Sequence, residues 1–275
     1  MKREQALRAK LHSLQMLSEA VDAMRSLSAH HLRLARAGLA PARAYKAGVD
    51  LALGSIGILQ PAPTAHEPAT LLLGADLGLC DGYTQRLTER ALARQQTAPG
   101  LLYCVGRRPL PLLARAGVGV TRAYDATSGV DGVTRLLLTL ADDVLGDYVR
   151  GRFATLSVVS ARFDGVGAFR VAETAVLPVT PATTGAARAA TPYVRPATLA
   201  RTAVREYLYS TLYGLLLDAL ASEHGMRLVA TESAGEWLNG QVQRLQRQLA
   251  GVRQEAATQE VLDVATGARR RRRTA

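Results

Sequence analysis

Residues 238–252 read LNGQVQRLQRQLAGV. Apolar side chains recur along this stretch at steps of four, three, four and three residues, the a and d spacing of a coiled coil, and Ala256 adds one more step. No proline interrupts residues 205–268, and a helix of that length would span roughly 90 Å, too long to bury its own apolar stripe. The stretch predicts a long C-terminal helix, residues 200–268, that packs against a partner helix. The predicted packing residues are Leu238, Val242, Leu245, Leu249 and Val252.

The N-terminal segment, residues 1–60, offers such a partner. Apolar residues recur there at steps of three or four, as on one face of a helix. They are Leu7, Leu11, Leu14, Leu17, Val21, Met24 and Leu27. The polar surface of this segment is mainly basic, and Pro41 is expected to kink the helix or to end its first part. Because the two helical segments bracket the rest of the chain, we expect them to meet as an antiparallel pair.

Proline-rich residues 60–68 and 178–196 mark linkers on either side of a middle region, residues 69–178. This region alternates apolar strands, at 70–73, 101–105, 118–124, 156–163 and 169–177, with helices at 83–96, 109–116 and 130–149. The last two strands are expected to form a hairpin. The predicted fold is therefore α/β plus long helices: an antiparallel coiled coil of the N- and C-terminal helices with an inserted Rossmann-like α/β domain.

Composition narrows the class of protein. The formal net charge is +11, which attracts nucleic acid, anionic lipid or an acidic protein. Part of that charge is Arg269–Arg273, in a basic tail at residues 269–275 that we expect to be unstructured. Cys80 and Cys104 are too few for a disulfide scaffold and are expected to be reduced core residues. No apolar run approaches the ~20 residues of a membrane span, and the N-terminus has no signal-peptide core, so we expect a cytoplasmic or peripheral protein.

Four motifs contain residue types that could carry chemistry. Residues 74–82 (GADLGLCDG) follow a strand and precede a helix, where a phosphate-binding loop would lie, but they lack its glycine and lysine spacing, which favours a structural turn. Glu223-His224 has no nucleophile, metal spacing or orienting group nearby, which favours a polar contact on the helix. His30-His31 is interpreted as a surface pair. Trp237 is either buried packing or an interface anchor. The sequence predicts no catalytic, cofactor-binding or metal-binding residue.

Three stretches resemble the gamma subunit of F-type ATP synthases. Residues 7–33 contain the family's Arg-x-Lys and Ala-Met elements, and residues 76–82 are similar to its Ser-Asp-Arg-Gly-Leu-Cys-Gly-Gly turn. Residues 221–227 match its Ala-Ser-Glu-His-x-x-Arg pattern, which is the most specific of the three. Two short motifs, Arg253-Gln254 and Thr258-Gln259-Glu260, follow at the family's spacing, although periodicity alone would make them a solvated helix face. The resemblance covers essentially the whole chain.

The chain also departs from the family pattern. Leu77 replaces an arginine of the glycine turn, Asp81 replaces a glycine, and Ala250 replaces an asparagine. Residues 235–239 replace the family's Ala-Thr-Asp-Asn-Ala run, and the arginine tail is not typical. These departures suggest a divergent branch, for which the sodium-linked N-type operon of some bacteria is one candidate.

The resemblance implies a non-catalytic rotor subunit without a cofactor, which couples ion-driven rotation of a membrane c-ring to ATP synthesis or hydrolysis. Its implied partners are the alpha and beta subunits of the catalytic head, the epsilon subunit and the c-ring. Nucleic acid is not among them, nor is direct insertion into the membrane. The implied place is the cytoplasmic face of a bacterial inner membrane. Carried over by motif, the residues that contact beta are Met24, Arg253, Gln254, Thr258 and Glu260.

Two other classes of function stay open at this point. A basic antiparallel coiled coil with an α/β domain is also compatible with a nucleic-acid-binding arm, whose affinity for RNA would fall steeply with salt. A phosphate-binding enzyme built on the α/β insert is a third possibility, which nucleotide-binding measurements would test.

Overall fold

The computed structural model describes residues 2–56, 67–179 and 196–273. The elements follow the chain as α1 (Lys2–Ile56), β1 (Pro68–Leu73), α2 (Tyr83–Thr97), β2 (Leu101–Val105), α3 (Leu110–Arg115), β3 (Arg122–Tyr124), α4 (Val130–Val149), β4 (Thr155–Gly165), β5 (Ala168–Leu177) and α5 (Pro196–Arg273). The predicted combination of two long helices and an inserted α/β region is confirmed. Most of both linkers, residues 57–66 and 180–195, lies outside the described residues.

The chain divides into two compact units. Residues 1–26 and 231–275 form one, which we call the helical unit, and residues 27–230 form the other, which we call the α/β unit. The divisions fall inside α1 and α5, not at the linkers that the sequence offered as boundaries. The reason is that residues 27–56 of α1 and the first part of α5 contribute to the core of the α/β unit.

The α/β unit is built on a five-stranded sheet in the order β3-β2-β1-β4-β5. Its first four strands are parallel, and β5 pairs with β4 antiparallel, which confirms the predicted edge hairpin. The prediction of a strand from residue 118 was wrong for residues 118–121, because the Val118 amide bonds to Leu113 of α3. Thr121 bonds to Leu102 through both its amide and its hydroxyl, so the regular ladder begins only at Arg122.

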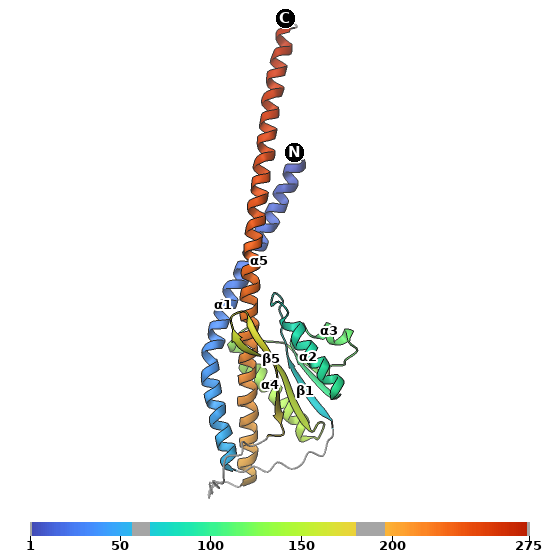
Figure 1. Cartoon of the computed structure of the whole chain (residues 1–275), viewed down its shortest axis with the longest axis vertical. Helices are drawn as coiled ribbons and strands as arrows, with labels where there is room; N and C mark the ends of the chain where they lie inside the picture. The colour runs from blue at the N-terminus through green and yellow to red at the C-terminus, as the bar shows by residue number, and fades with distance from the viewer. Residues whose placement is uncertain (1, 57–66, 180–195, 274–275) are drawn as a thin grey trace. The chain divides into compact units, whose positions relative to one another are not determined.

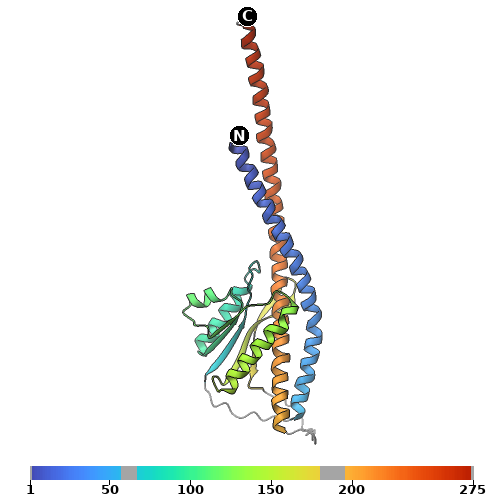
Figure 2. The same ribbon diagram turned by 180° about the vertical axis from the view of Figure 1, so that it is seen from behind.

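Helices cover both faces of this sheet (Figures 1 and 2). On one face α4 and parts of α1 and α5 share a core with alternate residues of β1 and β2, such as Leu71 and Tyr103. On the other face α2 and α3 pack over Leu72 and Leu102 in a second core. Cys80 and Cys104 are buried and free, as predicted. The inner strands are apolar on both sides, which suits a parallel sheet covered by helices on both faces.

Within the α/β unit, α1 and α5 run antiparallel. Gly38 of α1 lies so close to α5 that an added Cβ would be 3.1 Å from Leu217 Cδ1. Further along α1, the Tyr45 hydroxyl donates to Glu206 at 2.7 Å. Asp218 of α5 is buried and accepts hydrogen bonds from Arg43 (2.9 Å) and from the Phe163 amide of β4 (3.4 Å). This carboxylate therefore joins α1, β4 and α5.

Pro41 does not end α1, contrary to one of the two expected outcomes, because the helix continues through it to Ile56. A proline removes the hydrogen bond to the carbonyl four residues earlier, here that of Ala37. Both Pro41 and Ala37 are exposed, so water can reach that carbonyl. The cost is also offset by the buried side chains on the opposite face, such as Leu39 and Ala42.

In the helical unit the start of α1 pairs with the second half of α5. Val21, Leu238, Leu245 and Leu249 are buried there. The apolar face expected for α1 was wrong at two positions, because Leu17 is 50% and Leu27 58% exposed. The shielded positions of α1 follow a stripe that continues into the α/β unit and includes Leu7, Leu11, Leu14, Ser18, Val21, Met24 and Ser28. These positions keep an average step of about 3.5 residues. Leu17 and Leu27 each stand one residue before a shielded position and therefore turn away from the stripe.

The helix α5 continues through Arg273, where the sequence analysis had favoured an unstructured tail. Arginine is a good helix former and no proline follows Pro196, so nothing local ends the helix at residue 268. A search of the described residues found no helix apolar enough over a sufficient length to cross a bilayer.

Candidate functional site

Arg253 and Glu4 join the two helices of the helical unit. The Arg253 Nε donates to Glu4 Oε1 at 3.1 Å, and Arg8 donates to the same oxygen at 2.6 Å. These two arginines, Arg253 first, hold the pKa of the Glu4 carboxyl below its usual value. An exposed pair of this kind adds little stability. Its importance is geometric, because it sets residue 4 beside residue 253 and leaves the rest of the Arg253 guanidinium at the surface.

The other predicted contact residues of α5 lie on exposed helix surface beyond Arg253. Gln254, Thr258 and Glu260 are all exposed. The Thr258 hydroxyl donates to the Gln254 carbonyl at 2.8 Å, so its lone pairs are left to accept a bond from a partner. Gln254 and Thr258 also line a shallow hollow along this face of the helix, together with Gly251, Glu255 and Gln259. This face therefore carries exposed polar side chains that a partner can reach.

Met24 belongs to a different part of the helical unit. Glu4 lies beside Arg253, and Met24 is 20 residues further along α1, which is roughly 30 Å at the helical rise. Its side chain is half-buried. The five residues carried over from the family motif therefore form two separate stations and not one site.

Large apolar side chains are exposed on the helical unit. Trp237 is 60% exposed, so the alternative in which this chain itself buries the ring is wrong for the isolated chain. Met16, Leu17, Val261, Leu262 and Val264 are also exposed. The interface-anchor interpretation of Trp237 remains, because a large exposed ring is apolar surface that a partner can bury.

A buried polar cluster occupies the α/β unit at the carboxyl edge of the sheet. Arg227 of α5 is only 2% exposed. Its guanidinium donates to Glu223 at 2.5 Å and to the carbonyls of Leu77 (3.3 Å) and Gly78 (3.0 Å). Burial raises the pKa of Glu223, while the adjacent guanidinium opposes that change. One arginine thus fixes the glycine turn, 149 residues distant in sequence, onto α5.

His224 extends this cluster to a second loop. Its Nδ1 accepts a hydrogen bond from Arg227 (3.3 Å), so its Nε2 carries the proton and donates to the Ser128 carbonyl at 2.9 Å. The His31 ring of α1 packs against it with centroids 5.0 Å apart. The predicted polar contact of Glu223-His224 is confirmed, whereas the surface interpretation was wrong for His31, which is half-buried. The position of His31 on the α1 stripe, three residues after Ser28, was the signal that could have revealed this.

The glycine turn includes one strained residue. Leu79 has φ 56°, a left-handed conformation that a leucine adopts at a cost of about 1–3 kcal/mol. The carbonyls of the two preceding residues are those held by Arg227. Sequence reasoning identified the turn as structural but missed the role of Arg227, although its spacing of four residues from Glu223 places both on one face of a helix.

The neutral His224 makes stability depend on pH. Burial, followed by the nearby Arg227, lowers the pKa of His224 from 6.5 to about 4. Between those values the unfolded state binds more protons, so stability is complete above pH 6.5 and is lost as pH falls toward 4. We expect the unfolding free energy of the chain to fall by about 2 kcal/mol from this residue between pH 7 and pH 5. Urea unfolding followed by circular dichroism at both pH values measures this change.

The variant His224→Gln provides the control for that measurement. Glutamine can still donate to the Ser128 carbonyl but does not titrate. The fall in the variant's unfolding free energy between pH 7 and pH 5 should therefore be about 2 kcal/mol smaller than that of the wild type. An equal pH dependence in both proteins would show that His224 is not the group responsible.

Sequence comparison with known proteins identifies the relatives of this chain. The family model described as ATP synthase matches residues 3–269. The ATP synthase gamma chain of Pelotomaculum thermopropionicum is 26% identical over 275 residues, covering 95% of this chain and 96% of that protein. The gamma chain of Moorella thermoacetica is also 26% identical, with the same coverage of both chains.

Solved structures show the same fold. A chain of the rotor of the Euglena gracilis mitochondrial ATP synthase matches with a TM-score of 0.66 at 11% identity, covering 93% of this chain and 99% of that chain. A chain of the central stalk and c-ring structure of the Tetrahymena thermophila mitochondrial ATP synthase matches with a TM-score of 0.59 at 16% identity, covering 78% and 99%. Since the family match spans nearly all of the sequence and the relatives align over almost their full length, this chain belongs to the gamma-chain family of ATP synthases.

Proposed function

We propose that this chain is the central rotor subunit of an ATP synthase, which couples ion-driven rotation of a membrane c-ring to ATP synthesis or hydrolysis in the alpha and beta subunits. The main support is the match to gamma chains over 95% of the sequence. The alternative of a nucleic-acid-binding arm has no support among these relatives. In this proposal the chain performs no chemistry, and Glu223 and His224 hold loops in place instead of acting as acid and base.

The helical unit offers a physical basis for coupling. The start of α1 and the second half of α5 lie side by side, with Glu4 beside Arg253. Two paired helices of different sequence have no threefold symmetry, so three equivalent catalytic sites around them would each meet a different surface. Differential contact of this kind biases each site toward a different conformation, which is a coupling free energy between rotor angle and site state.

The proposed contacts with the beta subunits are made by two stations. Arg253, Gln254, Thr258 and Glu260 offer exposed hydrogen-bonding groups at one, and Met24 lies at the other, on a helix whose polar surface is basic. Complementary charge guides the encounter of two surfaces and fixes their register more than it adds affinity. We therefore expect an acidic segment of beta to bind at the second station. The α/β unit contacts epsilon and the c-ring. The whole is peripheral, on the cytoplasmic face of a bacterial inner membrane.

The variant Arg253→Ala tests the first station. We expect ATP-driven ion pumping per ATP hydrolysed to fall about fivefold or more in membrane vesicles, because coupling free energies between sites are typically about 1–3 kcal/mol. The fold should be unaffected, since Arg253 is exposed and its bond to Glu4 adds little stability. Pumping and hydrolysis are measured in the same vesicles.

Two further variants separate the possible causes of such a loss. Arg244→Ala removes an exposed arginine from the same helix and should pump normally. Glu4→Gln weakens the bond to Arg253 without removing the guanidinium and should also pump nearly normally. If Arg253→Ala pumps like the wild type, the proposed contact is wrong. If Glu4→Gln fails equally, the residue acts through the helix pair and not through beta.

A further inference from the structure

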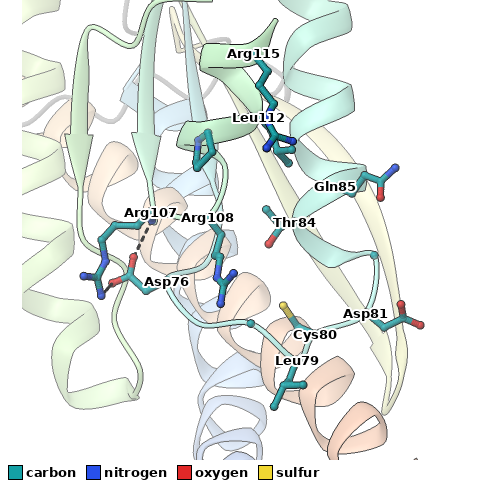
Figure 3. Close-up of a pocket in the computed structure, with 13 residues that line it drawn as sticks. Asp76, Leu79, Cys80, Asp81, Thr84, Gln85, Arg107, Arg108, Leu112 and Arg115 are labelled. Atoms are coloured by element: carbon teal, nitrogen blue, oxygen red, sulfur yellow. Dashed lines mark hydrogen bonds and ion pairs between the residues drawn. The ribbon is translucent and has the colours of Figure 1, made fainter.

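A second candidate site lies in the α/β unit, apart from the residues assigned to contacts with beta. A hollow of about 770 Å³ opens where β1 and β2 end, between the glycine turn, the start of α2 and the α3 segment (Figure 3). This volume is in the range of small-molecule sites. The carboxyl ends of parallel strands are also where open α/β sheets bind their ligands. Three arginines line the hollow: Arg107, Arg108 and Arg115.

Arg107 is already paired. Its amide donates to Asp76 Oδ1 at 2.8 Å, and its guanidinium lies 3.6 Å from Asp76 Oδ2 and 3.8 Å from Asp125 Oδ1. Asp76 is thereby compensated within the wall of the hollow. This pair contributes shape to the site and no net charge.

Arg108 and Arg115 are not paired in this way. Both are exposed, and no carboxylate in the described part of the chain lies within ion-pair distance of either. Figure 3 shows both side chains at the same hollow, with Thr84 between them in that view, while the Asp81 carboxylate points away from them. Asp81 also lines the hollow, but two guanidiniums outnumber its single carboxylate, so the hollow keeps a net positive charge.

The glycine turn accommodates Arg108 directly. A Cβ added at Gly78 would lie 2.7 Å from Arg108 Nη2, so the guanidinium lies directly over the turn. The Arg108 amide in turn donates to the Ala75 carbonyl at 3.0 Å. Because Arg227 holds the Leu77 and Gly78 carbonyls, the turn is fixed before any ligand arrives. Such preorganisation lowers the entropic cost of binding.

We propose that this hollow binds a small phosphate-bearing anion, with Arg108 and Arg115 as the residues that contact the phosphoryl oxygens and Thr84 as a further hydrogen-bonding group. Guanidinium groups match phosphate geometry and form charge-assisted bonds that are about twice as strong as neutral ones. The turn lacks the glycine and lysine pattern of a phosphate-binding loop, so arginine side chains replace backbone amides as the principal donors. The site is independent of the proposed rotor function.

Isothermal titration calorimetry on the purified full chain tests the site. The ligands are inorganic pyrophosphate, ATP, ADP and adenosine in the same buffer and salt. We expect pyrophosphate to bind and adenosine not to bind, because the recognised group is the phosphate. A higher affinity for ATP than for pyrophosphate would identify a nucleotide as the source of the anion, and equal affinities would identify a free polyphosphate. Failure of both pyrophosphate and ATP to bind at millimolar concentration would overturn the proposal.

Variants locate the binding within the chain. Arg108→Ala and Arg115→Ala should each weaken pyrophosphate binding about tenfold, which corresponds to the loss of about 1.4 kcal/mol. Arg135→Ala, which removes an exposed arginine of α4 away from the hollow, should bind like the wild type. If all three variants bind equally, the anion is held by general positive charge and the site is wrong. These measurements need no other subunit, so their failure would leave the rotor proposal untouched.

Discussion

Replacing Arg227 with alanine is expected to destabilise the α/β unit by about 3–5 kcal/mol. The variant leaves the Glu223 carboxylate buried without its cation, and it leaves the Leu77 and Gly78 carbonyls without their donor. Breaking one partner of a buried ion pair has a cost of this size because the remaining charge stays uncompensated. A loss of 3–5 kcal/mol is a large part of the about 5–15 kcal/mol by which a typical domain is stable. Urea unfolding followed by circular dichroism measures it.

A local readout distinguishes this mechanism from general damage. Cys80 lies in the glycine turn, whereas Cys104 lies in β2, and both thiols are buried. Release of the turn should make Cys80 react faster with a thiol reagent under native conditions while Cys104 remains protected. Arg201→Ala, which removes an exposed arginine of the same helix, should change stability by less than about 0.5 kcal/mol. An Arg227→Ala protein within 1 kcal/mol of the wild type would contradict the assigned role.

Leu238→Asp is expected to separate the two helices of the helical unit. Leu238 is 2% exposed on the stripe between them, and a carboxylate there would be buried without a partner. We expect the pair to lose about 3–5 kcal/mol, which few paired helices of this length could tolerate. Trp237 is the only tryptophan, so its fluorescence and anisotropy report on this unit during urea unfolding. Protection of the Cys104 thiol reports on the α/β unit, which should unfold at the same urea concentration as in the wild type.

The neighbouring residue supplies a matched control. Asn239→Asp adds the same charge one position away, on the exposed surface of the helix, and keeps Trp237 as the probe. It should shift the unfolding free energy by less than about 0.5 kcal/mol. Equal effects of the two substitutions would mean that the stripe does not depend on the burial of Leu238. A wild-type transition in Leu238→Asp would mean that the pair is held by other contacts.

Periodicity predicted those parts of this protein that depend on local pattern. The a and d spacing of residues 238–252 indicated a helix that needs a partner, and the apolar runs at 70–73 and 101–105 indicated the inner strands. The same argument failed on α1 at Leu17 and Leu27. Over a single turn, a step of three residues fits one helix face as well as a step of four, so an apolar residue next to the buried stripe can be assigned to it by mistake. Only the average over several turns separates the two registers, and the partner helix selects it.

The candidate site shows the same limit. The family motif identified Arg253, Gln254, Thr258 and Glu260 as a group, and exposure of all four on one stretch of α5 agrees with a role in binding a partner. The resemblance assigned Met24 to a segment of beta different from the one expected to meet those four residues, and both assignments stay predictions. The motif did not reveal that Arg227 reaches the glycine turn, since residues 77–78 and 227 are brought together only by the packing of α5 on the sheet edge.

By itself, the sequence determined the long helices, the order of strands and helices between them and the gamma-chain family, because each of these depends on residue type and spacing along the chain. The tertiary structure decided which face of α1 is buried, which carboxylates and histidines are held inside, and which arginines are left without a partner at the hollow. Those properties depend on burial and on distances between residues remote in sequence. The free energy of a charged or polar group changes by several kcal/mol with exactly those two quantities.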